Sequence, residues 1–419
     1  MHCRYVILIA VALPISLAAQ TDPHMAKAQR VLRTVPLVDG HNDLPWTIRN
    51  FTQAPRDVEA YDLRKTTSGH TDFARLRKGM VGGQFWSIYI PGDIKDSGYA
   101  RVQLEQFDIA RRTIARYPDM LEWALSAAAI RRAHARGRVG SLLGLEGGHA
   151  IENSLGALRV YYELGARYMT LTHNVTLDWA DAALDQAKHG GLTKFGEEVV
   201  REMNRLGMLA DLSHVSPGTM SDALNVTEAP VIFSHSSARG LTDVPRNVPD
   251  SILARLPQNG GVVMVTFVPI FISRKLVTHD SVRLAKRSEL RARYPNDSAA
   301  VARDLAEWDR TNTRPKATIA DVAEHIEHVR KVAGIDHVGI GSDFDGISET
   351  PEGLPDVSTF PTLFAELSRR GWSERDLRKL AGENVLRALA RAEVVAKRLQ
   401  RERPPSTQTI QQLDGAPKM

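Results

Sequence analysis

Short apolar runs, separated by longer amphipathic segments, recur along most of the chain. The runs lie at residues 36–40, 83–90, 139–145, 166–171, 208–212, 230–233, 261–267 and 337–340. They are too short for ordinary helices and too uniformly apolar for a sheet with one face in water. This pattern is typical of strands that are buried on both faces, as in parallel sheets.

The segments between the runs carry apolar residues at helical spacing and end at helix-stopping residues. Helices are predicted at residues 100–117, 155–164, 194–206 and 319–333, followed directly by Pro118, Gly165, Gly207 and Gly334. Strand alternating with helix eight times predicts an α/β fold in which a parallel sheet closes into a (β/α)8 barrel of the TIM type. The alternative is an open doubly wound sheet. No G-x-G-x-x-G follows the first strand, which removes the main support for a dinucleotide-binding fold.

Two segments depart from this rhythm. Residues 269–315 follow the seventh strand and are long, charged and partly helical (281–294 and 298–310), so we expect an insertion on the face where the strands end, as a lid or partner contact. Residues 361–398 predict two helices that pack on the barrel, divided at Gly371. The predicted organisation is a single barrel domain over residues 21–403, with a polar tail at 404–419.

The N-terminus has the features of a signal peptide. An apolar run at residues 5–17 follows a weakly basic start and precedes the small residues Ala18 and Ala19, so we expect residues 1–20 to be removed on export to the periplasm or the medium. A retained membrane anchor is the alternative. Cys3, the single cysteine, would be lost on cleavage, so no disulfide is expected. No lipid-anchor signal closes the chain, and we expect no stable membrane anchor.

The charge pattern disfavours a nucleic-acid partner. The chain carries 54 Lys and Arg residues against 49 Asp and Glu, a formal net charge of +5. The basic residues are spread along helical segments and alternate with acidic ones. This is typical of a solvated helix surface and not of a nucleic-acid groove.

Ionisable side chains stand where the predicted strands end. His41 and Asp43 leave the first strand two residues apart, a spacing that places both side chains on one face of an extended chain. Pro45 disfavours a helix that begins at Leu44, so we expect an exit into a loop. The ends of the third, fourth, fifth, sixth and eighth strands carry, in that order, Glu146, His173, His214, His235 and the pair Asp343 and Asp345.

Chemistry in a barrel gathers at the C-terminal ends of the strands, so these groups should share one rim. Burying them together is costly unless something pairs them, and two divalent cations would do so. The candidate ligands are His41, Asp43, Glu146, His214 and His235. They fill two metal sites if Glu146 bridges. Nitrogen and oxygen ligands without thiolate suit Zn2+ best, with Mn2+, Co2+ or Fe2+ as alternatives.

Other polar residues lack ligand spacing. Loop positions make His70, His149 and His189 poor candidates, and the helix face shared by His325 and His328 favours packing or solvation. Two loop aspartates, Asp178 and Asp181, either line the pocket or cap a turn.

The assembled motifs resemble those of the membrane (renal-type) dipeptidases and their bacterial relatives, which are binuclear zinc peptidases on a (β/α)8 barrel. The matching stretches are Val-Asp-Gly-His41-Asn-Asp43-Leu-Pro-Trp, Gly-Gln-Phe-Trp-Ser, Leu-Glu146-Gly-Gly, Leu-Thr-His173-Asn, Asp-Leu-Ser-His214-Val-Ser, Phe-Ser-His235-Ser-Ser-Ala, Arg246-Asn-Val-Pro-Asp, Gly-Ile-Gly-Ser-Asp343-Phe-Asp-Gly and Gly-Glu-Asn384-Val-Leu-Arg. They occur in the order of the family.

This resemblance implies a zinc-dependent dipeptidase in which His41 and Asp43 hold one zinc, His214 and His235 hold the other, and Glu146 bridges them. It also implies that His173 and Arg246 hold the substrate and that Asp343 handles protons or recognises the amine. The expected reaction is attack of a metal-bridging hydroxide on a dipeptide, with D-residues tolerated at the C-terminal position. A homodimer is expected by resemblance only, without an inter-subunit disulfide.

Two other functions are alternatives to dipeptide hydrolysis. Another binuclear hydrolase on the same barrel, such as an N-acyl-amino-acid deacylase or a lactonase, commonly uses His-x-His on the first strand and a modified lysine as the bridge. The His-x-Asp pair and the glutamate of this chain disfavour that alternative. An exported peptide-binding protein without turnover has no support in the ligand set.

Overall fold

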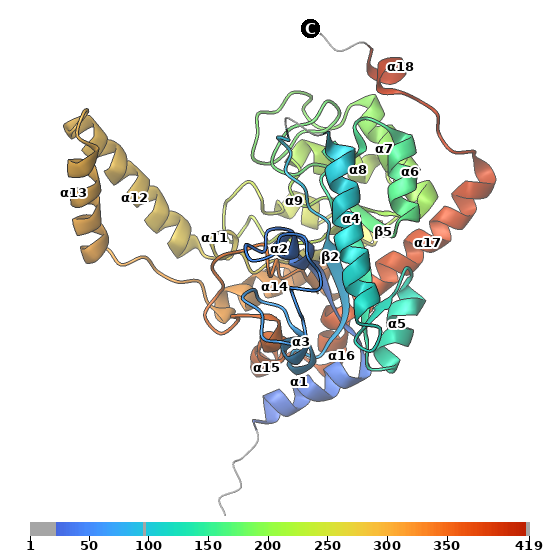
Figure 1. Cartoon of the computed structure of the whole chain (residues 1–419), viewed down its shortest axis with the longest axis horizontal. Helices are drawn as coiled ribbons and strands as arrows, with labels where there is room; N and C mark the ends of the chain where they lie inside the picture. Colours follow the sequence, from blue (N-terminus) through green and yellow to red (C-terminus); the bar gives the residue numbers. More distant parts are fainter. Residues whose placement is uncertain (1–21, 95–97, 416–419) are drawn as a thin grey trace, which may run out of the picture.

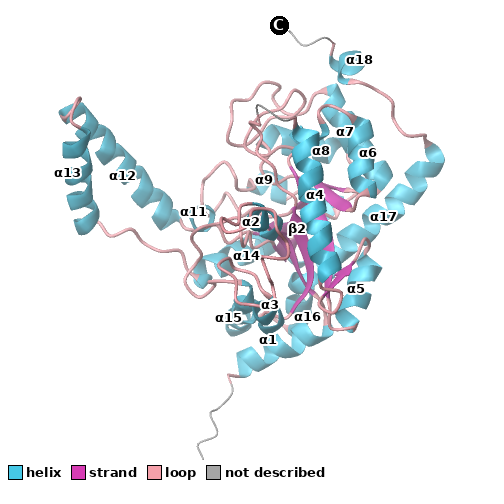
Figure 2. Ribbon diagram, in the orientation of Figure 1, coloured by secondary structure: helices cyan, strands magenta, loops and turns pink. Residues whose placement is uncertain are grey.

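The computed structural model describes residues 22–94 and 98–415, and the predicted signal peptide lies outside them. In this part of the chain, parallel strands form the centre and helices surround them (Figure 2). The strands are β1 (Leu37–Asn42), β2 (Val81–Ser87), β3 (Leu121–Trp123), β4 (Val139–Glu146), β5 (Ala166–Thr170), β6 (Leu209–Asp211), β7 (Ile232–Phe233), β8 (Val262–Val265) and β9 (Val338–Ile340).

The sheet closes on itself, as predicted. The strand order is β2-β1-β9-β8-β7-β6-β5-β4-β3, and β2 also pairs with β4, so eight parallel strands complete a (β/α)8 barrel and β3 is additional. The short strand β3 pairs with residues 139–141 at the start of β4, while β5 pairs with the later part of β4. Its three residues, Leu-Glu-Trp, form no apolar run, which is why the sequence pattern missed it.

Helices fill the connections between strands and cover the outside of the barrel. Those that precede β8 are α1 (Pro23–Thr34), α2 (Leu44–Arg49), α3 (Phe73–Lys78), α4 (Tyr99–Arg116), α5 (Ala127–Ala135), α6 (Leu155–Glu163), α7 (Lys194–Leu206), α8 (Pro217–Val226), α9 (Asp250–Leu253) and α10 (Leu256–Asn259). Those that follow it are α11 (Pro269–Ile272), α12 (Arg274–Arg293), α13 (Ser298–Thr311), α14 (Ile319–Ala333), α15 (Phe360–Arg369), α16 (Glu374–Arg378), α17 (Asn384–Glu402) and α18 (Ile410–Asp414).

Alternation along the strands separates the barrel interior from the layer beneath the helices. One buried cluster collects an inward residue from most strands together with apolar residues of α17, and its strand members include Val38, Phe85, Leu142, Tyr168, Leu209, Ile232 and Met264. The adjacent residues Leu37, Trp86 and Leu143 belong to the larger cluster shared with the surrounding helices. Successive side chains of a strand point to opposite faces, so the first cluster fills the barrel. Helix α17 contributes its apolar side chains to that interior cluster.

The insertion after β8 forms a two-helix arm. Helices α12 and α13 project away from the barrel (Figure 1), and their shared core is small, with Leu290, Val301 and Leu305 buried and Tyr294 packed against them. Helix α12 begins at Arg274, several residues before the predicted start. A single residue separates α11 from α12, so the arm is joined directly to the face that carries the strand ends.

The C-terminal region packs on the barrel in two helical parts, as predicted. The break falls at Gly371, whose φ of 89° favours glycine. Beyond it, α16 leads through a π-helical turn at Lys379–Glu383 into α17. Residues of the predicted polar tail form α18, where Ile410 is buried and the Asp414 carboxylate accepts a hydrogen bond from the backbone N–H of Phe195 at 3.3 Å. Among the described residues, no helix combines the length and apolar character needed to cross a bilayer.

Candidate active site

The mouth of the barrel brings together the ionisable groups predicted from the strand ends. Three sets of potential ligand atoms lie within 4.8 Å of one another: His41, Glu146 and His235; Glu146, His173 and His214; and His41, Asp43 and Asp343. All five predicted metal ligands are buried, and four of them, Asp43, Glu146, His214 and His235, line one cavity together with Arg246. Residues far apart in the sequence therefore meet at one centre.

A shift in the register between β1 and β2 turns the His41 side chain toward this centre. Val38 points into the barrel, and strict alternation would place His41 on the opposite face. The pairing of β1 with β2 is irregular between Asp39 and Asn42, however, and such irregularities re-aim side chains. As a result, the His41 ring lies 3.9 Å from the ring of His235, measured between centroids.

Asp43 occupies a different local structure from the one expected. It is the residue before helix α2, which begins at Leu44 in spite of Pro45. Proline is tolerated in the first turn of a helix because its missing N–H has no intrahelical partner there, so the expected loop exit was wrong. The expectation that the His41 and Asp43 side chains lie side by side was correct, since Asp43 Oδ2 lies 3.2 Å from His41 Nε2.

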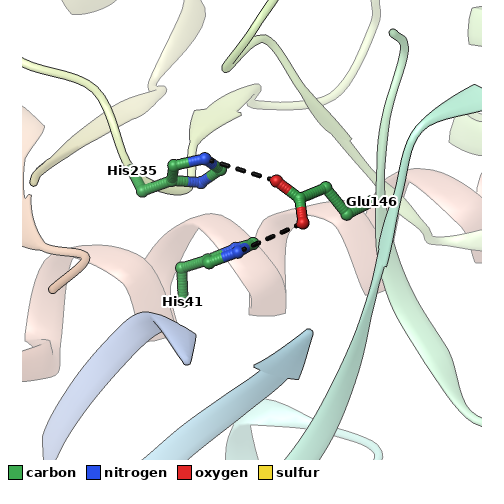
Figure 3. A group of neighbouring side chains, drawn as sticks. All are labelled: His41, Glu146 and His235. Carbon is green, nitrogen blue, oxygen red and sulfur yellow. Dashed lines mark ion pairs between the residues drawn. The ribbon is translucent and has the colours of Figure 1, made fainter. Parts of the chain in front are cut away.

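The Glu146 carboxylate lies between His41 on one side and His214 and His235 on the other. One oxygen, Oε2, lies 3.4 Å from His41 Nε2. The other, Oε1, lies 3.1 Å from His214 Nε2 and 3.5 Å from His235 Nε2. Figure 3 shows the carboxylate with one oxygen toward His41 and the other toward His235. This is the arrangement that a bridging carboxylate requires.

The other ring nitrogen of each of these histidines, Nδ1, already takes part in a hydrogen bond. Tyr168 Oη donates to Gly40 O at 3.2 Å and is thereby free to accept from His41 Nδ1 at 2.9 Å. Asn174 Oδ1 accepts from His214 Nδ1 at 3.0 Å, and Ser234 Oγ accepts from His235 Nδ1 at 2.8 Å. Protons on Nδ1 leave lone pairs on Nε2, which is the tautomer that ligates metals.

These lone pairs face one another and the carboxylate. His41 Nε2 is buried without a hydrogen-bond partner among the described residues, and the Nε2 atoms of His214 and His235 are 2.8 Å apart. Burial holds the pKa of His214 and of His235 well below its ordinary value, so these rings are neutral. Lone pairs directed at each other and at a carboxylate repel unless a cation lies between them.

The electrostatics around His41 also favour a cation at this centre. Burial opposes protonation, but neighbouring acidic groups, Glu146 and Asp43 among them, outweigh burial and raise the pKa of His41 well above its ordinary value. The position therefore favours positive charge at Nε2, which a proton or a metal ion can supply. The donor set of imidazole nitrogens and carboxylate oxygens fits divalent cations of the zinc type.

His173 borders the same carboxylate at a longer distance. Its Nε2 lies 3.9 Å from Glu146 Oε1, and its ring makes tilted contacts with those of Tyr89, at 4.8 Å, and His214, at 4.3 Å, between centroids. Burial lowers the pKa of His173, so the ring is neutral near pH 7 and can donate one hydrogen bond.

Arg246 presents a buried guanidinium to the cavity. Only 2% of the residue is exposed, and its nitrogens donate to Ser236 Oγ at 3.3 Å and to the His235 carbonyl at 3.4 Å. Phe271 lies beneath it at 5.3 Å. Burial lowers the pKa of Arg246 to about 10, so the group stays charged at neutral pH. Its contacts are long and neutral, which leaves the positive charge available to an anionic ligand.

Asp343 closes the site from the β9 side. It adopts a φ of 66°, and its backbone N–H donates to the His41 carbonyl at 3.1 Å. Burial, reinforced by Asp43 and Glu146, raises the pKa of Asp343 well above its ordinary value. A carboxyl group of raised pKa can hold a proton near neutral pH and pass it on.

The cavity itself has a volume of about 370 Å³, at the lower end of the range for small-molecule sites. Its walls add residues that the sequence analysis did not single out, namely Trp46, Tyr89, Asn174, Leu184, Val268, Phe271 and Ile347. Tyr89 could have been found, because it lies at the end of the predicted second strand, residues 83–90, to which the strand-end rule was not applied. The hydrogen-bond partners Tyr168 and Ser234 carried no signal of their own.

The remaining polar candidates have structural roles. His149 Nε2 is bonded to the Ile90 carbonyl at 3.0 Å. Asp181 accepts backbone N–H bonds from Lys188 and His189, so it caps a turn. Exposed Asp178 accepts from Asn153 at 2.9 Å. Neither aspartate lines the cavity, which decides the alternative left open by the sequence.

His325 packs on the barrel, as its helix face suggested. It is buried, accepts from the backbone N–H of Ala238 at 3.1 Å, and bonds the Ile272 carbonyl at 3.2 Å. His70 pairs with Asp345, whose carboxylate accepts from the His70 backbone N–H at 2.7 Å.

A comparison with known families decides the identity. The sequence profile described as membrane dipeptidase, peptidase family M19, matches residues 25–403. The chain belongs to the membrane dipeptidase family. It is therefore a metallo-dipeptidase, a hydrolase whose (β/α)8 barrel carries the clustered His, Glu and Asp residues of a metal-binding site.

Solved structures agree with this assignment. The metallopeptidase from Rhodobacter sphaeroides, solved with a phosphinate mimic of the dipeptide L-Ala-D-Ala, is 26% identical, with a TM-score of 0.70 over 86% of this chain and 99% of that one. The dipeptidase AC of family M19 gives 26% identity and a TM-score of 0.69 over 86% and 99%. The fold is also that of the probable dipeptidase PvdM from Pseudomonas aeruginosa, at 24% identity and a TM-score of 0.76 over 90% and 100%.

Proposed function

We propose that this membrane dipeptidase relative hydrolyses dipeptides with two Zn2+ ions held by His41, Asp43, Glu146, His214 and His235. The observation that carries the proposal is the placement of the Glu146 carboxylate, with one oxygen toward His41 and the other toward His214 and His235. When bound, a pair of divalent cations supplies a nucleophilic water of lowered pKa and polarises the scissile carbonyl. The side chains around this centre bind the substrate and move its protons.

Arg246 binds the C-terminal carboxylate of the substrate. Its planar fork suits a carboxylate, and its buried charge lacks a strong partner of its own among the described residues. Because this clamp lies in the same cavity of about 370 Å³ as Glu146, the distance between the carboxylate and the scissile bond is fixed. A fixed short distance favours dipeptides over longer chains.

His173 and Asp343 serve the reacting bond. The neutral His173 ring donates from Nε2 to the oxygen of the scissile carbonyl as negative charge develops there. A carboxylate oxygen of Asp343 takes the proton released by the attacking water and transfers it to the leaving amine nitrogen. The position of Asp343 supports this role, because one of its carboxylate oxygens lies within 4.8 Å of potential ligand atoms of His41 and Asp43.

Tolerance of a D-residue at the C-terminal position is also proposed. It is supported by the relative from Rhodobacter sphaeroides, which was solved with a mimic of L-Ala-D-Ala. Phe271 lies beside Arg246, and Val268 also lines the cavity; both side chains are apolar and make no directional demand on the configuration of the C-terminal residue.

The test combines metal analysis with a substrate panel. The purified protein is expected to hold two zinc ions and to cleave L,L- and L,D-dipeptides, while an N-acetylated amino acid and a lactone serve as comparison substrates. Preferential turnover of either comparison substrate would contradict dipeptide hydrolysis and favour the deacylase or lactonase alternative. A zinc content near one ion would contradict the bridged pair.

Export is proposed from the N-terminal sequence. The apolar run at residues 5–17, followed by Ala18 and Ala19, supports cleavage near residue 20. N-terminal sequencing of protein recovered from the periplasm or the medium is expected to begin close to Gln20 or Thr21. Recovery of an intact N-terminus in the membrane fraction would contradict export as a cleaved protein.

A further inference from the structure

Asp211 is a buried carboxylate beside the candidate metal centre, and it is none of the candidate ligands. It ends strand β6, where alternation from Leu209 points its side chain into the barrel. The same alternation points Thr170 and Ser234 inward, two residues beyond the interior residues Tyr168 and Ile232. The three side chains form one polar layer inside the barrel, near the strand ends.

Four hydrogen bonds saturate the Asp211 carboxylate. Its Oδ2 accepts from Thr170 Oγ1 and from Ser234 Oγ, both at 2.6 Å. Its Oδ1 accepts from the backbone N–H groups of Ser234, at 2.8 Å, and of Ser213, at 3.1 Å. A carboxylate offers about four such positions, so every one is used by a donor on β5 or just beyond β6 or β7.

These bonds fix the direction of the Ser234 hydroxyl. Because its proton is committed to Asp211, the Ser234 oxygen can only accept from His235 Nδ1, at 2.8 Å. The His235 proton is therefore held on Nδ1, and Nε2 keeps the lone pair that faces Glu146 Oε1 at 3.5 Å. The chain of bonds runs from a carboxylate through a hydroxyl to a candidate ligand.

We propose that Asp211 is a positioning residue that sets the tautomer of His235 through Ser234. It thereby controls metal affinity in the half of the centre formed by His214, His235 and one Glu146 oxygen. The inference rests on the proposed binuclear function and adds a residue to it. The other half of the centre, at His41, takes its tautomer from Tyr168 and should be independent of Asp211.

The isosteric change Asp211→Asn tests the direction of these bonds. The asparagine oxygen can keep the two backbone N–H bonds, which places its NH2 group against Thr170 and Ser234. Both hydroxyls must then accept, and the Ser234 proton turns toward His235 Nδ1. The His235 proton moves to Nε2, where it blocks ligation, although the size and packing of the site are unchanged.

Asp39 offers a matched control. Its carboxylate also binds a serine, accepting from the backbone N–H and from Oγ of Ser342, each at 2.7 Å. Gln84 completes this cluster at 3.1 Å. Asp39 follows Val38, so it lies on the opposite face of the strand, and its serine bonds no histidine ring of the described residues. Asp39→Asn removes a comparable buried carboxylate without touching the His235 tautomer.

The experiment measures zinc affinity directly, by competition with a chromophoric chelator, and zinc content by elemental analysis. Wild type and Asp39→Asn are expected to hold two ions with similar affinities. Asp211→Asn is expected to hold one ion as tightly as wild type and the other roughly 10–100-fold more weakly. The Co2+ absorption spectrum of its singly loaded form should match that of singly loaded His235→Ala.

Each outcome of this experiment is informative. The role of Asp211 is contradicted if folded Asp211→Asn holds two ions with wild-type affinities. It is also contradicted if Asp211→Asn and Asp39→Asn lose affinity equally. Neither result would contradict the binuclear function. Fewer than two ions in wild type would overturn the binuclear function and this inference with it. If Asp211→Asn does not fold, Ser234→Ala decides, because it removes the hydroxyl from the same chain. Selective loss of one ion in Ser234→Ala supports the proposal, and full retention of both contradicts it.

Discussion

The Nε2 atoms of His214 and His235 lie 2.8 Å apart, and the Nδ1 atom of each ring is occupied by a separate acceptor. Two neutral imidazoles in this state bring two lone pairs together. The arrangement is stable only with a positive charge between or beside the two nitrogens. Glu146 Oε1 lies next to them, 3.1 Å from His214 Nε2. The first prediction concerns this carboxylate.

Glu146→Gln should abolish bridging, because an amide offers one acceptor and turns an NH2 group toward the opposite pair of ligands. We expect kcat/KM for a dipeptide to fall at least about 100-fold, with zinc content below two ions. Glu163→Gln, at the end of α6 and away from the cavity, is the control and should match wild type. Near-normal turnover by folded Glu146→Gln would refute the bridge.

Arg246→Lys keeps the charge but loses the planar fork. We expect kcat/KM to fall about 100-fold for dipeptides with a free C-terminal carboxylate, mainly through KM, and far less for the corresponding dipeptide amides. The control is Arg239→Lys, on the same loop, where the guanidinium pairs with Asp243 at 2.9 Å. Equal losses on the acid and the amide would show that Arg246 does not bind the carboxylate.

Acid should destabilise the fold through His325. Burial lowers the pKa of this histidine to about 4, whereas the unfolded chain has the ordinary value near 6.5. Between these values the unfolded state binds more protons, so stability is fully present above pH 6.5 and is lost as the pH falls toward 4. The loss from this group is at most about 3 kcal/mol.

The measurement is urea denaturation of the metal-free protein between pH 4 and 7.5. His325→Gln can retain the bonds to Ala238 and Ile272 but cannot titrate, so its stability should fall less steeply over this interval. A wild-type slope in His325→Gln would assign the acid sensitivity to other groups.

Gly144→Ala should disturb the His41 side of the centre. A Cβ at Gly144 meets the ring and hydroxyl of Tyr168, the residue that binds His41 Nδ1. We expect a loss of about 1–3 kcal/mol in the free energy of unfolding, together with weaker binding of one zinc ion. Gly156→Ala, near the start of α6 where the added methyl has room, should be close to neutral.

Tyr168→Phe separates the two effects of that change. It keeps the ring in place and removes only the hydroxyl, so zinc affinity should fall with little change in packing. Unchanged zinc binding in both Gly144→Ala and Tyr168→Phe would show that Tyr168 does not control the ligand His41.

The sequence by itself determined the barrel and which ionisable side chains gather at its mouth. Doubly buried parallel strands need uniformly apolar runs, and residues that leave the C-terminal ends of such strands must meet, so Glu146, His214 and His235 could be placed together without coordinates. The pattern failed where its physical basis was absent. Strand β3 carries Glu122 between its two apolar residues and shows no apolar run. Helix α2 includes Pro45 in its first turn, where a proline removes no intrahelical hydrogen bond.

Only the tertiary structure decided how the site is tuned. The turn of His41 into the mouth depends on a register shift, and the tautomer of each histidine depends on one hydrogen bond at Nδ1, which for His41 comes from a distant strand. Tyr168 and Asp211 have no distinctive spacing in the sequence, because their roles come from the three-dimensional position of a single hydroxyl or carboxylate. Periodicity records which face a side chain occupies, whereas hydrogen-bond partners across a closed barrel are set by the register between strands.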